Sequence, residues 1–111
     1  MTGDAPLISD DERSAFRRDG AVVLRSKFSS DWISALQAGI DADIANPTEN
    51  FARHTKDPEA PAYLEDFWAW DKVPEFRDFV HNSPCAPIAA SLLGAPSINL
   101  VMDNWFLREA G

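Results

Sequence analysis

Residues typical of helix starts and helix ends divide this chain into short segments. The positions of these residues restrict the possible folds more than any other feature. Ser9 and Glu12 stand three positions apart, as in a capping box, in which each side chain accepts a hydrogen bond from the other residue's backbone N–H. Gly20 follows as a stop signal, because glycine readily adopts the left-handed conformation that ends many helices. We therefore predict a short helix between Ser9 and Gly20, with Phe16 on its inner face.

Three further helices follow from signals of the same kind. The first and longest runs from Ser29 or Ser30 to about Ala45 and has apolar residues at helical spacing. The second begins at Pro74, and the third is capped by Ser83 and closed by Gly94. Each of these two has a proline in its first turn, where the missing N–H is not needed.

Runs rich in β-branched and aromatic residues predict the strands. We expect a buried strand at 21–25 and a long strand at 97–108, with weaker signals at 63–70 and near 51–53. This order of elements is typical of an α+β fold. A strand as long as the last one needs partners on both sides unless it lies at an edge. The chain offers few such partners, so we expect it to be part of a longer protein.

Composition narrows the class of protein. A hydrophobic fraction of 45% in 111 residues suits a single small domain spanning 1–111, of which we expect residues 1–8 to be flexible. The net charge of −8 repels phosphate backbones and anionic lipids, so we expect no nucleic-acid or membrane partner. No secretory signal begins the chain, and no apolar run approaches the roughly 20 residues that cross a bilayer. We expect a cytoplasmic protein.

The residues that most often carry chemistry are few. His54 and His81 are the only histidines, and neither has the His-x-Asp or His-x-Glu spacing of a mononuclear iron site. We predict that His54 is solvated in a polar loop and that His81 lies at a helix C-terminus, so we expect no metal site here. The single cysteine, Cys85, excludes an internal disulfide. We interpret it as a small buried hydrophobe; the alternative is a thiolate stabilised at a helix start.

Acidic pairs and aromatic residues each admit two interpretations. The pairs are Asp10-Asp11, Asp41 with Asp43, and Glu65-Asp66. We expect the first to favour a helix start and the other two to lie on solvated faces, rather than to act as catalytic acid and base. An aromatic cluster, Phe67, Trp68 and Trp70, is interpreted as core, with an apolar substrate pocket as the alternative.

Three segments, in order, resemble the phytanoyl-CoA dioxygenase family of Fe(II)- and 2-oxoglutarate-dependent oxygenases. They are Phe16–Leu24, with its Asp-Gly pair before an apolar run; Phe79–Gly94, ending in Leu-Leu-Gly; and Asp103–Gly111, ending in a basic-acidic-small-Gly turn. The resemblance implies that the chain is the helical shell and first strands of a double-stranded β-helix (a jelly-roll, cupin-like fold), incomplete in this chain. It covers residues 10–111.

The resemblance also implies a function for the longer protein. Members of the family use Fe(II) and 2-oxoglutarate to hydroxylate a small organic or lipid-like substrate, and some are halogenases. The family's His-x-Asp follows the last of these segments, so the chain alone would lack the iron ligands and be inactive. Arg108 matches the basic residue that can reach 2-oxoglutarate, a dianion that favours charge-assisted pairs. Asp103 and Trp105 share a strand face by period two and would lie on the same pocket side.

Two other functions are compatible with the sequence. One is a non-enzymatic helical module that binds another protein, which would have to fold stably by itself. The other is a redox protein acting through Cys85, which would require a thiol that reacts rapidly at neutral pH.

Overall fold

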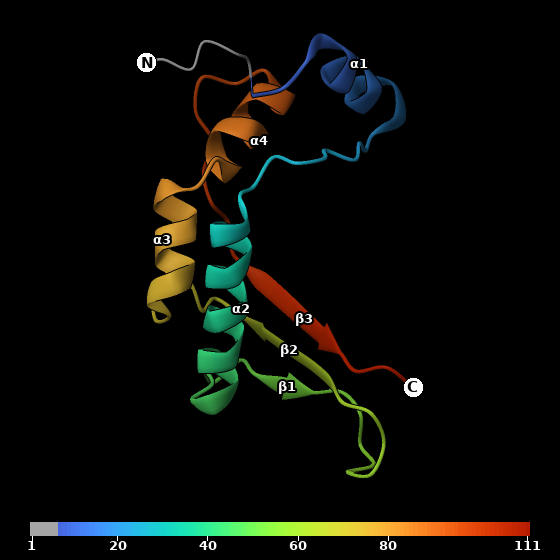
Figure 1. The fold of residues 1–111 in the computed structure, drawn as a ribbon, viewed down its shortest axis with the longest axis vertical. Helices are drawn as coiled ribbons and strands as arrows, with labels where there is room; N and C mark the ends of the chain where they lie inside the picture. Colours follow the sequence, from blue (N-terminus) through green and yellow to red (C-terminus); the bar gives the residue numbers. More distant parts are fainter. Residues whose placement is uncertain (1–6) are drawn as a thin grey trace.

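A computed structural model describes residues 7–111, which form four helices and one three-stranded antiparallel sheet (Figure 1). The α+β class predicted from the sequence is confirmed. The elements are α1 (Asp10–Asp19), α2 (Ser30–Ala45), β1 (Ala52–Arg53), β2 (Tyr63–Phe67), α3 (Pro74–Asn82), α4 (Cys85–Leu93) and β3 (Asn104–Arg108). The sheet order is β1-β2-β3, so β2 is central and β1 and β3 are edges.

The N-terminal helix α1 has the predicted caps. The Ser9 hydroxyl accepts the Glu12 N–H at 3.0 Å, and the Glu12 carboxylate accepts the Ser9 N–H at 2.8 Å. Gly20 ends the helix with φ of 77°, in the left-handed region. Of the segment predicted to be flexible, residues 1–6 lie outside the described part of the chain, and Ile8 is buried.

Residues 21–25 are not a strand, so this prediction was wrong. They form an extended connection between α1 and α2, at the end of the molecule away from the sheet (Figure 1). The Val23 side chain is 71% exposed. A β-branched run fits a pleated, half-buried surface but becomes a strand only where a neighbouring strand supplies hydrogen bonds. Within residues 7–111 this segment has no such neighbour.

The last strand is also shorter than predicted, covering 104–108 rather than 97–108. It pairs with β2 over five residues, from Tyr63 opposite Arg108 to Phe67 opposite Asn104. β2 stops there because Trp68 adopts a left-handed backbone conformation, with φ of 52°. Once β2 turns away, the residues before Asn104 have no partner to pair with. The short strand predicted near 51–53 is confirmed as β1.

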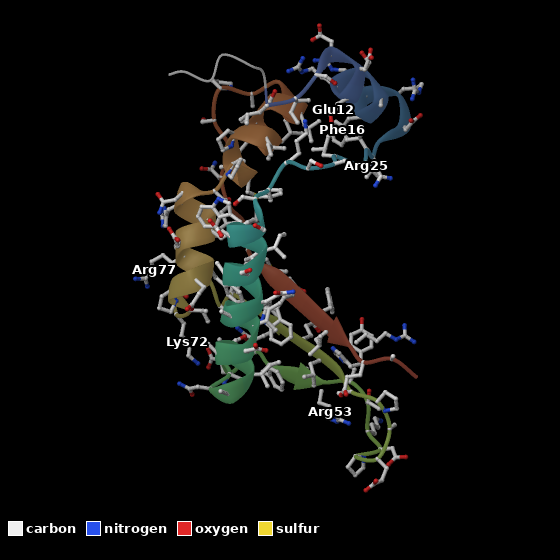
Figure 2. The ribbon with its side chains drawn as sticks, viewed as in Figure 1. Glu12, Phe16, Arg25, Arg53, Lys72 and Arg77 are labelled. Carbon is white, nitrogen blue, oxygen red and sulfur yellow. The ribbon has the colours of Figure 1, made fainter. Side chains whose placement is uncertain are left out.

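The core lies where α2 and α3, packed side by side, meet one face of the sheet (Figure 1). Its centre is formed by Ala69, Val73, Phe76 and Trp105, and partly buried residues of α2 surround it. Figure 2 shows Arg77 on the outer side of α3, away from α2. None of the helices in residues 7–111 has the length and apolar character required to cross a membrane.

Candidate functional site

The two faces of the sheet differ, and the register of β2 and β3 decides which residues lie on each. Leu64 and Asp66 of β2 are paired with Leu107 and Trp105 of β3, on the face that meets the helices. Because side chains alternate along a strand, the intervening residues point the other way. We call this second surface the open face; it carries Tyr63, Glu65, Phe67, Asn104, Phe106 and Arg108.

A polar network crosses the open face. The Glu65 carboxylate accepts a hydrogen bond from the Asn104 amide at 2.9 Å, and its other oxygen lies 2.7 Å from His54 Nε2. These two contacts, that of Asn104 first, lower the pKa of Glu65 below its ordinary value. His54 was predicted to be simply solvated. It is exposed, but antiparallel pairing of β1 with β2 brings it beside Glu65, a contact that loop composition did not reveal.

Aromatic rings and one cation flank this network. The Tyr63 ring packs edge-on against both His54, at 5.1 Å between centroids, and Phe106, at 6.1 Å. The Arg108 guanidinium carbon lies 6.0 Å from the centre of the Tyr63 ring, within range of a cation–π contact. No carboxylate of residues 7–111 forms a salt bridge with Arg108. Arg108 is also exposed to solvent.

The structure does not bring Asp103 and Trp105 together with Arg108. Trp105 lies on the opposite, covered face, where it is part of the core and only 8% exposed. The alternation of side chains explains this, since Trp105 and Arg108 are three positions apart and the strand is regular between them.

Asp103 has a structural contact of its own. Its carboxylate accepts the backbone N–H groups of Ala69 at 3.2 Å and Trp70 at 3.3 Å, and its carbonyl oxygen accepts that of Trp68 at 3.1 Å. Three successive N–H groups of the turn after β2 are thus satisfied by one residue. These bonds hold Trp68 in its left-handed conformation, which costs a bulky residue about 1–3 kcal/mol.

Sequence reasoning missed a buried pair of carboxyl groups. Asp43 and Asp66 were predicted to lie on solvated faces, but they are 1% and 0% exposed. Burial, followed by the hydrogen bond to Asp66, raises the pKa of Asp43 to about 6. Asp43 occurs one turn after apolar Ile40 and next to Ile44, so its helical position was the one available signal. Its partner comes from a strand 23 positions later, which spacing alone does not show.

A cavity of about 250 Å³ lies between α2, α3 and the start of β3. Its lining is mostly apolar, with Leu36, Ile40, Phe76, Phe79 and Trp105 as the main contributors. Asp103 and Asn104, at the start of β3, complete its lining.

Residues 7–111 contain no group of three His, Cys, Asp or Glu side chains placed to hold a metal ion. His54 and Glu65 are only two potential ligands, and they are hydrogen-bonded to each other. The residues present therefore do not fit a mononuclear iron site. His81 lies in the last turn of α3, as predicted.

Cys85, interpreted as buried from the sequence, is exposed at the start of α4, so this interpretation was wrong. Partial desolvation of its sulfur nevertheless raises the pKa of the thiol. A raised pKa disfavours the thiolate, so the geometry gives no support to a reactive cysteine.

Comparisons of the chain with protein-family models, with curated proteins and with solved structures gave no match.

Proposed function

We propose that this chain is the N-terminal part of an Fe(II)- and 2-oxoglutarate-dependent dioxygenase, similar to the phytanoyl-CoA dioxygenase family, that hydroxylates a small organic or lipid-like substrate. The proposal begins from the three ordered sequence segments that resemble the family. The geometric observation that supports it best is the difference between the two faces of the sheet. Helices cover one face, and the other carries polar and aromatic side chains with an exposed arginine.

This arrangement suits one sheet of a double-stranded β-helix. In such a fold the helices lie outside and the opposite face of the sheet points into the barrel, where ligands bind. The free edge of β3 would accept a further strand, because its outer N–H and C=O groups have no partner within residues 7–111. On this proposal the open face is the inner surface of the barrel.

Arg108 is the residue of the chain that we propose to contact 2-oxoglutarate. It stands on the open face, is exposed, and is positioned by the Tyr63 ring rather than by a carboxylate. A guanidinium binds a carboxylate through two parallel hydrogen bonds, which are among the stronger polar contacts in proteins. The proposal uses Arg108 alone, because Trp105 is in the core and Asp103 holds a turn.

Iron(II) would supply the oxygen-activating chemistry, but residues 7–111 do not form its site. The proposal therefore assigns the iron ligands to residues outside this chain. What this chain contributes is the co-substrate contact, the aromatic surface of the open face, and the covered core that holds both in place.

The first test is the nucleotide sequence that follows the codon for Gly111. We expect the reading frame to continue into a His-x-Asp or His-x-Glu, with a second His and an Arg further on. A stop codon directly after Gly111 would contradict the proposal, and the helical interaction module would then be the better hypothesis.

The second test measures catalysis by the protein translated from the complete reading frame. With iron(II), we expect 2-oxoglutarate to be converted into succinate, and we expect Arg108→Ala to raise the KM for 2-oxoglutarate by about tenfold or more, the loss of roughly one charge-assisted pair. Arg25→Ala is the matched control, since Arg25 is exposed on the connection before α2, far from the open face (Figure 2). Equal KM values for the two variants would remove Arg108 from the site.

A further inference from the structure

Two carboxyl groups lie against Trp105 inside the core: Asp43 accepts the indole N–H, and Asp66 is the cross-strand partner of Trp105. Asp43 is in the last third of α2, and Asp66 is in the middle of the covered face of the sheet. Both residues are buried, and no Lys, Arg or His of residues 7–111 forms a salt bridge with either. Two buried carboxylates without a cation are costly, because ionised groups lose their hydration and repel each other.

The hydrogen bonds around the pair are unequal. Asp66 is well supplied with donors: one oxygen accepts the Thr48 hydroxyl at 2.5 Å and the Phe67 N–H at 2.9 Å, and the other accepts the Thr48 N–H at 3.1 Å. Asp43 has one donor, the indole N–H of Trp105, at 2.9 Å from its Oδ2. Its other oxygen, Oδ1, is buried and has no partner in the described structure.

A proton fits this arrangement better than a metal ion does. A metal would need a third ligand, and no group of three candidate side chains exists in residues 7–111. The oxygens of Asp66 are also already engaged by three donors. A proton on Oδ1 of Asp43, by contrast, turns that oxygen into a hydrogen-bond donor. The pair then carries a single negative charge, which lies on Asp66, the residue that accepts more hydrogen bonds.

We propose that Asp43 and Asp66 form a proton-dependent latch between α2 and the sheet. With one proton shared between them, the pair joins α2 to β2, and the Trp105 indole extends the bond to β3. Loss of that proton leaves two negative charges in the core and weakens the attachment of α2. The latch is independent of the proposed oxygenase function, since it uses only residues of the covered face.

The surrounding charges set the range in which the latch responds. Lys72 is the cation that acts on Asp43, and it lies where α2 ends, with its ammonium group bonded to the carbonyl oxygens of Asn46 and Pro47 (Figure 2). Glu75 of α3 faces α2 one turn before Asp43, against Gly39. Glu65 is adjacent to Asp66 but lies on the open face, and Asp103 precedes β3. Only Lys72 among these groups favours ionisation of Asp43.

The pKa values of the two carboxyl groups are shifted in opposite directions. Burial first, and then Asp66, raise the pKa of Asp43 from an ordinary 3.8 to about 6. Burial also opposes ionisation of Asp66, but hydrogen bonds from Asp43, Thr48 and Phe67 outweigh it and lower the pKa of Asp66. Between about pH 4 and pH 6, the folded protein therefore holds one more proton in this pair than the unfolded chain does.

The sign of the pH dependence follows from this difference. As pH rises from 3.8 to about 6, unfolded Asp43 releases its proton while folded Asp43 retains it, so the folded state loses stability over that window. As pH falls below 3.8, unfolded Asp66 takes up a proton before folded Asp66 does, and stability falls again. The contribution of the pair to stability should therefore be greatest near pH 3.8, where the folded pair holds a single proton.

Thermal unfolding as a function of pH, compared among three proteins, tests the latch. For the wild type we expect the unfolding equilibrium constant to rise by up to roughly 100-fold between pH 4 and pH 7 from this pair. In Asp43→Asn that rise should disappear, because an amide can donate to Asp66 and accept from Trp105 at any pH. Asp41→Asn, an exposed change on the same helix, should keep it. If Asp43→Asn and Asp41→Asn have the same pH profile, the latch is excluded.

Carbon-13 NMR of the aspartate carboxyl groups provides a measurement that needs no variant to fold. We expect one aspartate of the wild type to titrate near pH 6, and one indole N–H signal to shift with the same midpoint, because the Trp105 indole donates to Asp43. If every aspartate titrates below about pH 5, the two groups do not share a proton and the proposal is wrong.

Discussion

The covered and open faces of the sheet are built from the same strands, yet they have different roles. Neighbouring residues of β3 show the contrast: Trp105 is 8% exposed and packs in the core, whereas Phe106 is 57% exposed on the open face. On the covered face, the polar side chains Asp43 and Asp66 are buried, and all of their oxygens except Oδ1 of Asp43 are hydrogen-bonded. On the open face, polar side chains form a partly exposed network around Glu65.

This difference separates stability from recognition in one small sheet. Residues of the covered face determine whether α2, α3 and the strands stay together. Those of the open face are half-buried or exposed, so we expect their substitution to cost less stability. Substitutions that affect only one face can test this division.

The largest effect is expected from Trp105→Ala. It removes a large buried ring and leaves the second oxygen of Asp43 without a donor, so we expect a loss of about 3–5 kcal/mol in the free energy of unfolding. Phe106→Ala, at the next position, should cost less than about 1 kcal/mol because its ring is already exposed. Chemical denaturation of both variants is the measurement, and similar losses would mean that the faces are not distinct.

The next effect concerns the turn that ends β2. Asp103→Ala removes a carboxylate that accepts two backbone N–H groups and helps hold Trp68 in its left-handed conformation. We expect a loss of about 2 kcal/mol in the free energy of unfolding. Asp71→Ala, at an exposed site in the same turn region, is the control and should change stability by less than about 0.5 kcal/mol. A loss equal to that of the control would show that the turn holds its shape without Asp103.

A smaller loss should follow from Gly39→Ala, within the helical layer behind the covered face. The added Cβ would lie 2.6 Å from a ring carbon of Phe76, so the ring must move. Overpacking costs about 1–3 kcal/mol, and alanine's better helix propensity offsets up to about 1 kcal/mol of it.

The double variant of Gly39→Ala with Phe76→Leu checks the cause of that loss. The double variant should be nearly as stable as Phe76→Leu alone, because the smaller leucine leaves room for the Cβ added at position 39. Equal costs in both backgrounds would show that the contact between α2 and α3 is looser than the structure indicates.

The smallest effect on stability, and a clear effect on ionisation, is expected on the open face. Asn104→Ala removes the main contact that lowers the pKa of Glu65, so the pKa of Glu65 should rise toward its ordinary value of 4.5. The stability that the lowered pKa provides is present above pH 4.5 and is lost as pH falls, so the variant and the wild type should converge in acid. Carbon-13 NMR of the glutamate carboxyl groups measures the shift, and an unchanged pKa would contradict the network.

Much of the local structure could be predicted because its causes are local. The capping box at Ser9 and the glycine stops at Gly20 and Gly94 occur where expected, since a cap depends on residues within one helical turn. The strand predictions were less accurate. Residues 21–25 and 97–103 have the composition of strands but find no strand to pair with in the described residues 7–111. A strand requires a partner that the segment's own sequence does not specify.

The candidate site divides in the same way. Arg108 was singled out by the resemblance to the oxygenase family, and the structure places it, exposed, on the open face. The network of His54, Glu65 and Asn104 could not be predicted from the sequence, because it joins residues from three strands or their ends. Asp43 and Asp66 were misassigned to solvated faces for the same reason, since each is acidic and ordinary in its own segment.

The sequence by itself determined the α+β class and most of the starts and ends of the helices, because these depend on interactions within a few residues. The exception is α4, which has Pro84 rather than the predicted Ser83 as its N-cap. The tertiary structure decided which strand runs find partners, which face of the sheet is covered, and which carboxyl groups are buried together. Burial and pairing arise only when distant segments meet, and in this protein they convert two unremarkable aspartates into a proton-sharing pair.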